Sequence, residues 1–593
     1  MTRRFERELR RLRLSFPAPG VAPPAETPLA ETLLAHEKLA GETVADEKLT
    51  DENFAGETLA DEKLVEQIAA AVRQALRLKT AGPRLLEFGQ REPTAEARLA
   101  GDWPMPSEGL DGVVRELCEC LEGLPLETHP RNQVNVNAQP STAAIIGALL
   151  PTLFNPNLAS DGRGAGCSRA EQRVTALAAE LAGFDPQAAG GLFTFGGTGT
   201  VLYGVKLGLE TAIPGAMRTG IDRPVVVLAS ERAHHTCLTA AGWLGIGEER
   251  VWRVPAEDDF SASAQAFEAC ASRAIEAGYR IAAIVATVGT TDAFGVDDVA
   301  SLVAARDRLV AKHRLDYSPH VHADAVIGWA WNVFRDYDFS SNGLEFDAET
   351  RDALQRMANR VAGLCHADSL GVDFHKTGFV PYVASLFLVR RGDNLEKLAR
   401  QRDSMPYLFH SGQHHPGRYS LETTRSASGV LAAFASLRLF GRDGLRVLLG
   451  AAIARTRRLR HGLAVKPWIQ LMNASTDGPV TLFRAYPPGW NAAEAWRREL
   501  KDPAFAAQSL EVNAFNRRIH EATQAAAREG GLAGVGWTEA VRRGAAGQPL
   551  AALKSYLLSP FLDEHAIDEL ILHMDRIRES FSMSTHTKPA EAI

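Results

Sequence analysis

Several features that would assign the chain to a common class of protein are missing. None of its apolar runs is long enough to cross a bilayer. Basic residues are not in excess, because 65 Lys and Arg stand against 72 Asp and Glu, which gives a formal net charge of −7. This balance gives no electrostatic reason to expect a nucleic acid or an anionic membrane as the partner.

Cysteine is also sparse. The six cysteines are scattered, and their spacing is not that of a metal-binding knuckle. Such usage fits a reducing compartment better than a disulfide framework. The N-terminal segment MTRRFERELRRLRLSF is basic but lacks a long apolar core, so it does not resemble a secretory signal. We therefore expect a cytoplasmic globular protein, whose 45% hydrophobic residues suffice for a large core.

Residues 1–104 are expected to form a linker and a helical arm. Residues 17–32 are rich in Pro and Ala, and the acidic segment LAGETVADEKLTDEN is then followed directly by its near copy FAGETLADEKLVEQI. The run DEKLVEQIAAAVRQALRLK has apolar residues at helical spacing. The duplication is either a spacer or an arm that packs on a partner, since two repeats are too few for a solenoid.

The remaining chain predicts an α/β protein. In residues 105–400, strand-like runs such as PVVVLAS, RIAAIVATVGT and HVHADAVIGWA alternate with helical patterns such as VDDVASLVAARDRLVAKH. This alternation indicates a mostly parallel sheet covered on both faces, which binds ligands beyond the carboxyl ends of its strands. Residues 401–593 hold helices and a few apolar strands, including PVTLFRAY and LKSYLLSPF, as expected of a smaller α+β domain.

Two ionisable residues stand in unusually apolar surroundings. The segment ADSLGVDFHKTGF carries Lys376, and burial makes a lysine a better imine-forming amine. The segment HADAVIGW places Asp324 at the expected end of a strand, where a protonated pyridine nitrogen would be a suitable partner. Taken singly, Lys376 could be a solvated loop lysine. The HxD pair could bind a metal, although no third ligand at helical spacing accompanies it.

Three further segments are weaker signals. FTFGGTGTVLYGVKLGLE turns through glycines into a helix whose first N–H groups could bind an anion, although it is neither a full Rossmann fingerprint nor a Walker loop. VLASERAHHT places His234 after a strand, where a structural histidine is an equally good reading. ATVGTTDAFGVDDV ends a strand in a Gly-Thr-Thr segment that could be merely a turn.

In this order, the five segments resemble the group II pyridoxal-phosphate-dependent amino acid decarboxylases over roughly residues 125–450. That family includes the glutamate, aromatic amino acid, histidine and diaminobutyrate enzymes. The resemblance implies an aspartate aminotransferase-like fold (fold type I) and pyridoxal 5′-phosphate as the cofactor, with no metal. It also implies a homodimer with a shared active site, and decarboxylation of an L-amino acid through an internal aldimine on Lys376.

The resemblance also implies roles for individual residues. Lys376 of DFHK would form the imine, Asp324 of HADA would pair with the pyridine nitrogen, and His234 of SERAHHT would stack on the ring and assist proton transfer. Tyr407 of MPYLFH lies in a segment similar to the mobile loop that carries the family's catalytic tyrosine. Arg425 of LETTRSAS resembles, more loosely, an arginine-containing segment after that loop.

The cofactor's phosphate and ring oxygen would have their own ligands. By the same resemblance, the phosphate would be held by Gly197, Thr198, Ser369 and His375, and Thr287 would lie near the ring oxygen. In the segment HPRNQVNVNAQPS, the asparagines could contact the substrate or could simply cap turns; they are Asn132, Asn135 and Asn137.

The chain departs from the family pattern at several positions. Gly199 stands where an acidic residue or Ser is usual, Val326 where a small Ala is usual, and Phe374 where Pro is common. An insertion over residues 331–360 separates the aspartate strand from the lysine segment. These departures leave the cofactor interpretation intact, but they predict a divergent branch whose substrate the sequence does not reveal.

Two kinds of alternative function remain open. The same scaffold could run another pyridoxal-phosphate reaction, as a carbon–carbon lyase, an aldehyde-forming oxidative deaminase or an aminotransferase. Tyr407 argues against the aldehyde-forming branch, where this tyrosine is typically replaced. A protein of another class, a non-catalytic scaffold with an acidic partner-binding arm, would have no use for Lys376, Asp324 and His234.

Overall fold

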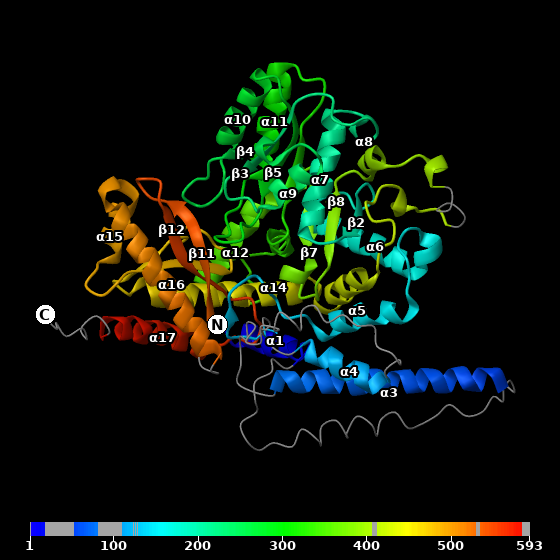
Figure 1. Ribbon diagram of the computed structural model, residues 1–593, viewed down its shortest axis with the longest axis horizontal. Coiled ribbons are helices and arrows are strands. Elements are labelled where there is room, and N and C mark those ends of the chain that lie inside the picture. The colour runs from blue at the N-terminus through cyan, green and yellow to red at the C-terminus, as the bar shows by residue number, and fades with distance from the viewer. Residues whose placement is uncertain are drawn as a thin grey trace, which may run out of the picture. The chain divides into compact units, whose positions relative to one another are not determined.

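A computed structural model of the chain describes residues 2–17, 52–80, 109–121, 124, 126, 129–405, 412–528 and 534–583 (Figure 1). The chain divides into two compact units. The first comprises Met1–Pro17, Gln133–Ala522 and Val535–Ile593, and the second comprises Ala18–Asn132 and Thr523–Gly534. Of the helices in the described ranges, none is both long and apolar enough to span a membrane.

A seven-stranded sheet forms the centre of the first unit. Its strand order is β2-β8-β7-β6-β5-β3-β4. Strands β7, β6, β5, β3 and β4 pair in parallel, whereas β8 runs antiparallel to both of its neighbours. The strands are β2 (Gly190–Thr194), β3 (Val225–Ser230), β4 (Val251–Val254), β5 (Arg280–Thr287), β6 (His320–Asp324), β7 (Ser369–Asp373) and β8 (Ser385–Val389). The predicted α/β class and the mostly parallel sheet are confirmed.

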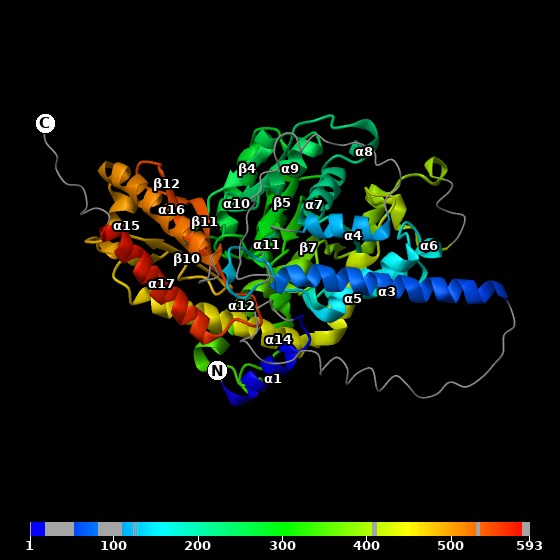
Figure 2. The ribbon, with the colours of Figure 1, turned by 60° about the horizontal axis from the view of Figure 1, so that its bottom comes forward.

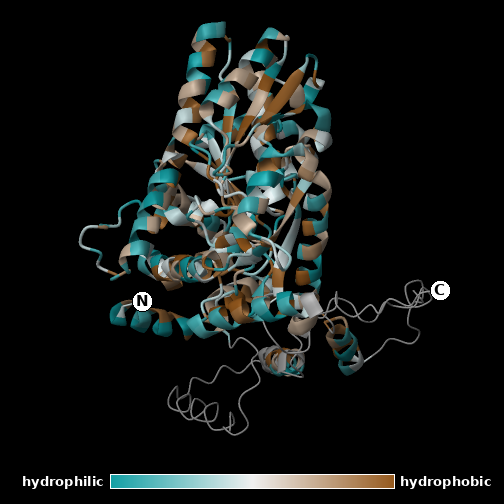
Figure 3. Ribbon diagram, turned by 90° about the vertical axis from the view of Figure 1, so that its left-hand side faces the viewer, coloured by the Kyte–Doolittle hydropathy of each residue, from teal (hydrophilic) through white to brown (hydrophobic). Residues whose placement is uncertain are grey.

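Helices cover both faces of this sheet, because successive residues of its central strands are apolar on both sides. One face is covered by α7 (Gly197–Ala212) and α9 (Thr236–Trp243), and the other by α10 (Ala264–Glu276) and α11 (Val299–His313) (Figure 1). Figure 3 shows apolar, brown strand segments between helices whose outer sides carry teal residues. The other helices of this part of the first unit are α5 (Thr142–Phe154), α6 (Asp161–Ala182), α8 (Ala216–Thr219), α12 (Ala348–Val361) and α13 (Phe374–Thr377).

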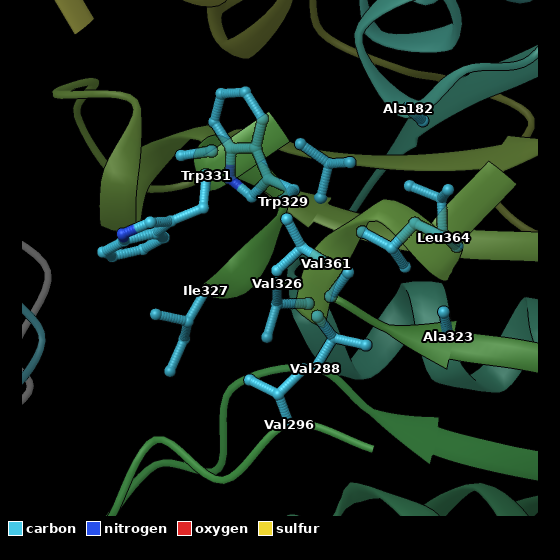
Figure 4. Packing of buried hydrophobic residues seen from close by; sticks show 14 of the residues in the cluster. Ala182, Val288, Val296, Ala323, Val326, Ile327, Trp329, Trp331, Val361 and Leu364 are labelled. Carbon is cyan, nitrogen blue, oxygen red and sulfur yellow. The ribbon is translucent and has the colours of Figure 1, made fainter. Parts of the chain in front are cut away.

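The largest buried cluster reaches the carboxyl edge of the sheet. There Val288, Val296, Val326, Ile327 and Trp331 pack together (Figure 4). Full burial of a side chain of this size contributes about 1.5–3 kcal/mol. The strand ends that support polar residues are therefore held by a close-packed apolar layer.

A smaller, antiparallel sheet holds the C-terminal part of the first unit. Its order is β1-β11-β12-β10-β9. The elements are β1 (Asn132–Gln133), β9 (Ile469–Leu471), β10 (Val480–Ala485), β11 (Gly534–Arg543), β12 (Pro549–Tyr556), α15 (Ala492–Lys501), α16 (Ala506–Arg528) and α17 (Glu564–Met583). The predicted strands in PVTLFRAY and LKSYLLSPF correspond to β10 and β12 (Figure 2).

The long helix α14 (Ser428–Ala464) joins the two sheets. It packs against α5 on the side of the large sheet and against α17 on the side of the small one. It also contacts α1 (Arg3–Arg13), whose Phe5, Leu9 and Leu12 are buried. Residues 2–17 therefore belong with the first unit rather than with the arm that follows them. Residue 400, where the sequence suggests a boundary between two domains, lies inside this unit.

The second unit contains two described helices. They are α3 (Glu52–Thr80) and α4 (Leu110–Glu119). The predicted helix over DEKLVEQIAAAVRQALRLK lies within α3, so it is confirmed. The linker and most of the first copy of the duplicated sequence lie outside the described residues.

Candidate active site

A pocket opens where the central strands end. It has about 560 Å³ of empty space when the adjoining open solvent is counted. Its lining residues come from the turns after β2, β3, β5, β6 and β7: Gly197, Thr198, His234, Thr236, Thr287, Gly289, Thr291, Asp324, Val326, Asp373, His375 and Lys376. The structure thus brings together seven of the predicted site residues, as expected for parallel strands whose carboxyl ends share one edge.

Lys376 stands on the short helical turn α13, which is pinned on both sides. The ring of Phe374 is buried between Phe193 and Trp329, with ring centroids 5.8 and 5.0 Å away. The Thr377 hydroxyl donates to the Ile327 carbonyl oxygen at 3.0 Å. Phe374, which stands where the family commonly has proline, is therefore a core residue that fixes the turn. The half-buried side chain of Lys376 projects from this turn into the pocket.

Asp324 and Thr287 end two adjacent strands and lie side by side in register. Both side chains are buried, and among the described residues neither Asp324 Oδ1 nor Thr287 Oγ1 has a hydrogen-bond partner. Burial raises the pKa of Asp324 to about 6, although the charge of Lys376 acts in the opposite direction. Two buried oxygens thus face the pocket ready for a ligand, since unpaired buried polar groups are costly.

Asp297 supports Thr287 from behind. This fully buried carboxylate accepts the backbone N–H of Thr287 at 2.8 Å and that of Ala262 at 2.7 Å. Burial raises the pKa of Asp297 to about 7, against the effect of both hydrogen bonds. The end of β5 is therefore held by a carboxyl group that gains a proton near neutral pH.

The Asp297→Asn variant tests this role of Asp297, because it should change how the free energy of unfolding depends on pH. Because the pKa of Asp297 is about 7 in the folded state and 3.8 ordinarily, the folded protein holds this proton more tightly than the unfolded chain. The folded state is therefore penalised as pH rises above 3.8, and fully so above about 7. Relative to the variant, the wild-type free energy of unfolding should fall by up to about 4 kcal/mol from acid to alkaline pH. Urea denaturation of the cofactor-free proteins measures this, and a difference that does not change with pH would contradict it.

The first turn of α7 borders the pocket. The N–H groups at a helix start have no partners within the helix, so they suit an anion. A Cβ at Gly197 would come within 2.8 Å of Asp373 Oδ2 and 3.2 Å of Val326 Cγ1, so only glycine fits. A Cβ at Gly199 would lie 2.4 Å from Thr194 Oγ1, which explains why this chain has no acidic residue or Ser there.

His234 and His235 follow β3, and their ring centroids are 4.0 Å apart. Of the two, His234 lines the pocket, as predicted, and its Nδ1 accepts the backbone N–H of Thr236 at 3.3 Å. Burial, the neighbouring His235 and the charge of Lys376 lower the pKa of His234 to about 4. The ring is therefore neutral near pH 7 and suited to lie against a flat ligand.

His375 is buried beside Lys376, and desolvation lowers its pKa. Its Nδ1 lies 3.2 Å from the Ala384 carbonyl oxygen, and its ring packs on Tyr382 with centroids 4.6 Å apart. The Tyr382 hydroxyl donates to Asn137 Oδ1 at 2.6 Å. Asn137 thus contacts a side chain that packs on a pocket residue, rather than capping a turn alone.

Asp373 is a pocket residue that the motifs did not single out. It ends β7, its side chain is 1% exposed, and its Oδ2 lies 2.9 Å from Lys376 Nζ. The signal that could have found it is its position, three residues before Lys376 at the end of a buried strand. That position is the one expected for ligand-binding residues in a parallel sheet.

The prediction for Ser369 is corrected. Ser369 begins β7, and its fully buried hydroxyl lies 2.7 Å from His320 Nε2 and 2.9 Å from His322 Nδ1. It is not among the residues that line the pocket, because the pocket lies at the other end of this strand. His322 is likewise committed to this buried trio, and no cluster of His, Cys, Asp or Glu within the described ranges could hold a metal.

Two further predicted residues have different outcomes: Arg425 does not line this pocket, and Tyr407 is not among the described residues. Tyr407 lies in residues 406–411, which are outside the described residues. Arg425 is buried and forms an ion pair with Glu171, with Nη1 2.5 Å from Oε1. It also donates to the carbonyl oxygens of Leu158 and Phe193. Arg425 therefore joins α6, β2 and the segment before α14.

Comparison with known proteins shows which family the chain resembles. L-2,4-diaminobutyrate decarboxylase of Rhizobium meliloti is 27% identical over 429 residues, 70% of this chain and 78% of that protein. The solved structure of mouse CSAD has a TM-score of 0.68 at 17% identity and covers 86% of this chain and 98% of its own. That of Oryza sativa TDC with PLP and tryptamine has a TM-score of 0.67 at 15% identity, over 91% and 100%. Both show the same fold.

The family model described as the pyridoxal-dependent decarboxylase conserved domain matches residues 126–484, more than half of the chain. This range contains every residue of the pocket. The chain therefore belongs to the pyridoxal-dependent decarboxylase family, and it is a pyridoxal-phosphate-dependent enzyme that decarboxylates an amino acid.

Proposed function

We propose that the chain converts an L-amino acid to the corresponding amine and CO2 with pyridoxal phosphate attached covalently to Lys376. The observation that supports this most directly is that Lys376 and the buried carboxylate of Asp324 line one pocket. A flat, phosphorylated pyridine ring needs an amine for its aldehyde, an acceptor for its ring N–H and an anion site for its phosphate.

The residues present fit such a group. Asp324 Oδ1 and Thr287 Oγ1 are buried without partners among the described residues, which suits contacts with the ring nitrogen and the ring oxygen. The glycine-lined start of α7 suits the phosphate. Gly197, Thr198 and His375 would hold the phosphate, Asp324 and Thr287 the polar edges of the ring, and His234 one of its faces.

When bound, the cofactor supplies an electron sink for the bond that loses CO2. Asp324 would keep the proton on the ring nitrogen, which it can do because a nearby opposite charge stabilises its ionised form. Neutral His234 would fix the ring. Tyr407, or His234 after it has itself taken up a proton, would deliver a proton to the substrate carbon. The apolar wall around Val326 and Ile327 would exclude water from this transfer.

A substrate panel tests the proposed function. The purified holoenzyme is offered L-2,4-diaminobutyrate first, then aspartate, glutamate, tyrosine, tryptophan and lysine, while CO2 and amine are quantified together. CO2 and amine in equal amounts from at least one amino acid support the proposal. A carbonyl product, or turnover without CO2, would favour one of the other reactions on this scaffold. A colourless protein without bound cofactor would revive the non-catalytic alternative.

Tyr407→Phe tests the proposed proton donor. Without the phenolic O–H, the substrate carbon is protonated more slowly, so amine formation should fall by about 10²-fold or more. The share of carbonyl by-products should rise. Chromatography of the products formed with wild type and variant checks both expectations. An unchanged product ratio and rate would remove Tyr407 from the mechanism.

We also propose that the enzyme is a homodimer, as the family resemblance implies. Helix α5 supports this, because its small residues face α14 while its large ones face outward. A Cβ at Gly147 would lie 2.6 Å from the Leu431 carbonyl oxygen. Five large apolar residues of α5 are each 40–49% exposed, and they are Ile145, Ile146, Leu149, Leu150 and Leu153. Exposed apolar faces of this kind mark protein interfaces, and sedimentation equilibrium of the full chain measures the mass.

A further inference from the structure

The Asp373 carboxylate lies against the amine of Lys376. Its Oδ2 lies 2.9 Å from Lys376 Nζ, and its Oδ1 accepts the Ser385 hydroxyl at 2.6 Å. The side chain is 1% exposed, so water does not compete for these contacts. Ser385 begins β8 and is itself fully buried, which fixes the direction of the carboxylate.

Other charged or titratable groups approach this pair from each neighbouring element. His375 Nε2 lies 3.5 Å from Asp373 Oδ2, on the same turn as Lys376. Asp324, at the end of β6, interacts electrostatically with both Asp373 and Lys376, and so does His234 in the turn after β3. The start of α7 lies against the carboxylate, because a Cβ at Gly197 would be 2.8 Å from Oδ2.

This position is a poor one for a carboxylate whose task is to hold a phosphate. Two anions at one helix start repel each other, so Asp373 opposes phosphate binding there while it is ionised. A carboxylate in contact with an amine has a different use. An ammonium group has no lone pair, so Lys376 must lose a proton before its nitrogen can bond to an aldehyde carbon.

We propose that Asp373 accepts the proton of Lys376 when pyridoxal phosphate becomes attached, and that Ser385 holds the carboxylate in position for this transfer. The inference rests on the proposed attachment at Lys376. The nitrogen–carbon bond forms as the carbon–oxygen double bond of the aldehyde breaks. Of the three ammonium protons, one stays on nitrogen and two leave with that oxygen as water. Asp373 passes on the proton that it accepted and ends ionised, as it began.

Two ligands separate proton transfer from binding. Cofactor-free wild type, Asp373→Asn and Ser385→Ala are mixed with pyridoxal phosphate, and attachment is followed by absorbance and by borohydride trapping with peptide mass spectrometry. The same proteins are titrated with pyridoxine 5′-phosphate, which has no aldehyde and cannot become attached. Rates are recorded from pH 6 to pH 9.

We expect Asp373→Asn to attach pyridoxal phosphate at least about 10²-fold more slowly at pH 7. The deficit should shrink as pH rises, because solvent then removes the proton. Pyridoxine 5′-phosphate should bind this variant as tightly as wild type, or more tightly, since a negative charge is removed. Ser385→Ala should slow attachment by about tenfold, because it removes one hydrogen bond to a charged group.

Two outcomes would overturn the inference. One is attachment to Asp373→Asn at the wild-type rate. The other is a loss of affinity for pyridoxine 5′-phosphate as large as the loss in the rate of pyridoxal phosphate attachment, which would indicate a structural role. Ser385→Ala keeps the inference testable if Asp373→Asn does not fold, because wild-type attachment by that variant would remove the positioning role and with it the proposal. Trapping of the cofactor on a residue other than Lys376 in wild type would instead refute the proposed function.

Discussion

Lys376→Ala should bind pyridoxal phosphate without covalent attachment, and it should decarboxylate its substrate at least ~10³-fold more slowly. The amine at position 376 is the pocket's nucleophile, and alanine leaves its place without a reacting group. Borohydride treatment should then fix no cofactor to the chain, whereas wild type should gain the cofactor's mass on the peptide that contains Lys376. Loss of the visible absorbance band should accompany this result.

Lys397→Ala is the matched control for this variant. Lys397 is an exposed lysine outside the pocket, and its Nζ contacts Thr211 Oγ1 at 3.1 Å. Its removal should leave trapping, absorbance and turnover unchanged. Trapped cofactor on Lys376→Ala would show that another lysine carries the group, and the proposed site would then be wrong.

Asp324→Asn should lower kcat by about 10²–10³-fold while the cofactor remains attached. A neutral amide no longer stabilises a proton on the ring nitrogen, so the electron sink weakens. The cofactor-free variant should also resist unfolding better than wild type at pH 8. This follows because burial raises the pKa of Asp324 from 3.8 to about 6, so the folded state is penalised as pH rises above 3.8, and fully so above about 6.

The two halves of this prediction have separate measurements. Turnover and the absorbance spectrum report on the holoenzyme, and urea denaturation at pH 5 and pH 8 reports on the cofactor-free protein. The stability gain should be complete at pH 8 and clearly smaller, about half as large, at pH 5. Asp316→Asn changes an aspartate whose side chain is 76% exposed, so it should alter neither quantity. Wild-type turnover by Asp324→Asn would contradict the proposed pairing with the ring nitrogen.

Much of the site could be predicted because the chemistry sits at the ends of strands. Short apolar runs mark β3, β5, β6 and β7, and a parallel sheet gathers the residues that follow such strands at one edge. Lys376, Asp324, Thr287 and His234 were therefore identifiable from the sequence. The resemblance then supplied roles that periodicity alone could not provide.

Ser369 was wrongly placed because a motif does not show where a strand begins. It lies four positions before Asp373, and at strand geometry this distance along the chain is about 13 Å. The serine therefore reaches two buried histidines and not the pocket. Asp373 was missed for the converse reason, because only the packing shows that this carboxylate turns toward Lys376 and not away from it.

The boundary expected near residue 400 falls inside the first compact unit. The sequence shows helices and strands in both parts, but it does not show that one helix, α14, contacts elements of both. That contact depends on which side of α14 meets α5, where close approach requires a glycine at position 147. Composition and periodicity do not report such distances between elements.

The fit of Val326 has a consequence for any attempt to change the substrate. Its Cγ1 occupies space left by two glycines, because a Cβ at Gly197 or at Gly371 would lie 3.2 or 3.3 Å from it. The three residues thus share one packed space. Replacing Val326 alone with the smaller alanine would leave a void that costs ~1 kcal/mol of stability per missing methyl group. Enlarging either glycine alone would push the wall toward the ligand. Shrinking Val326 would not make room for a methyl group at either glycine, because a Cβ at Gly197 would still meet Asp373 Oδ2 and one at Gly371 would still meet Thr200 Oγ1.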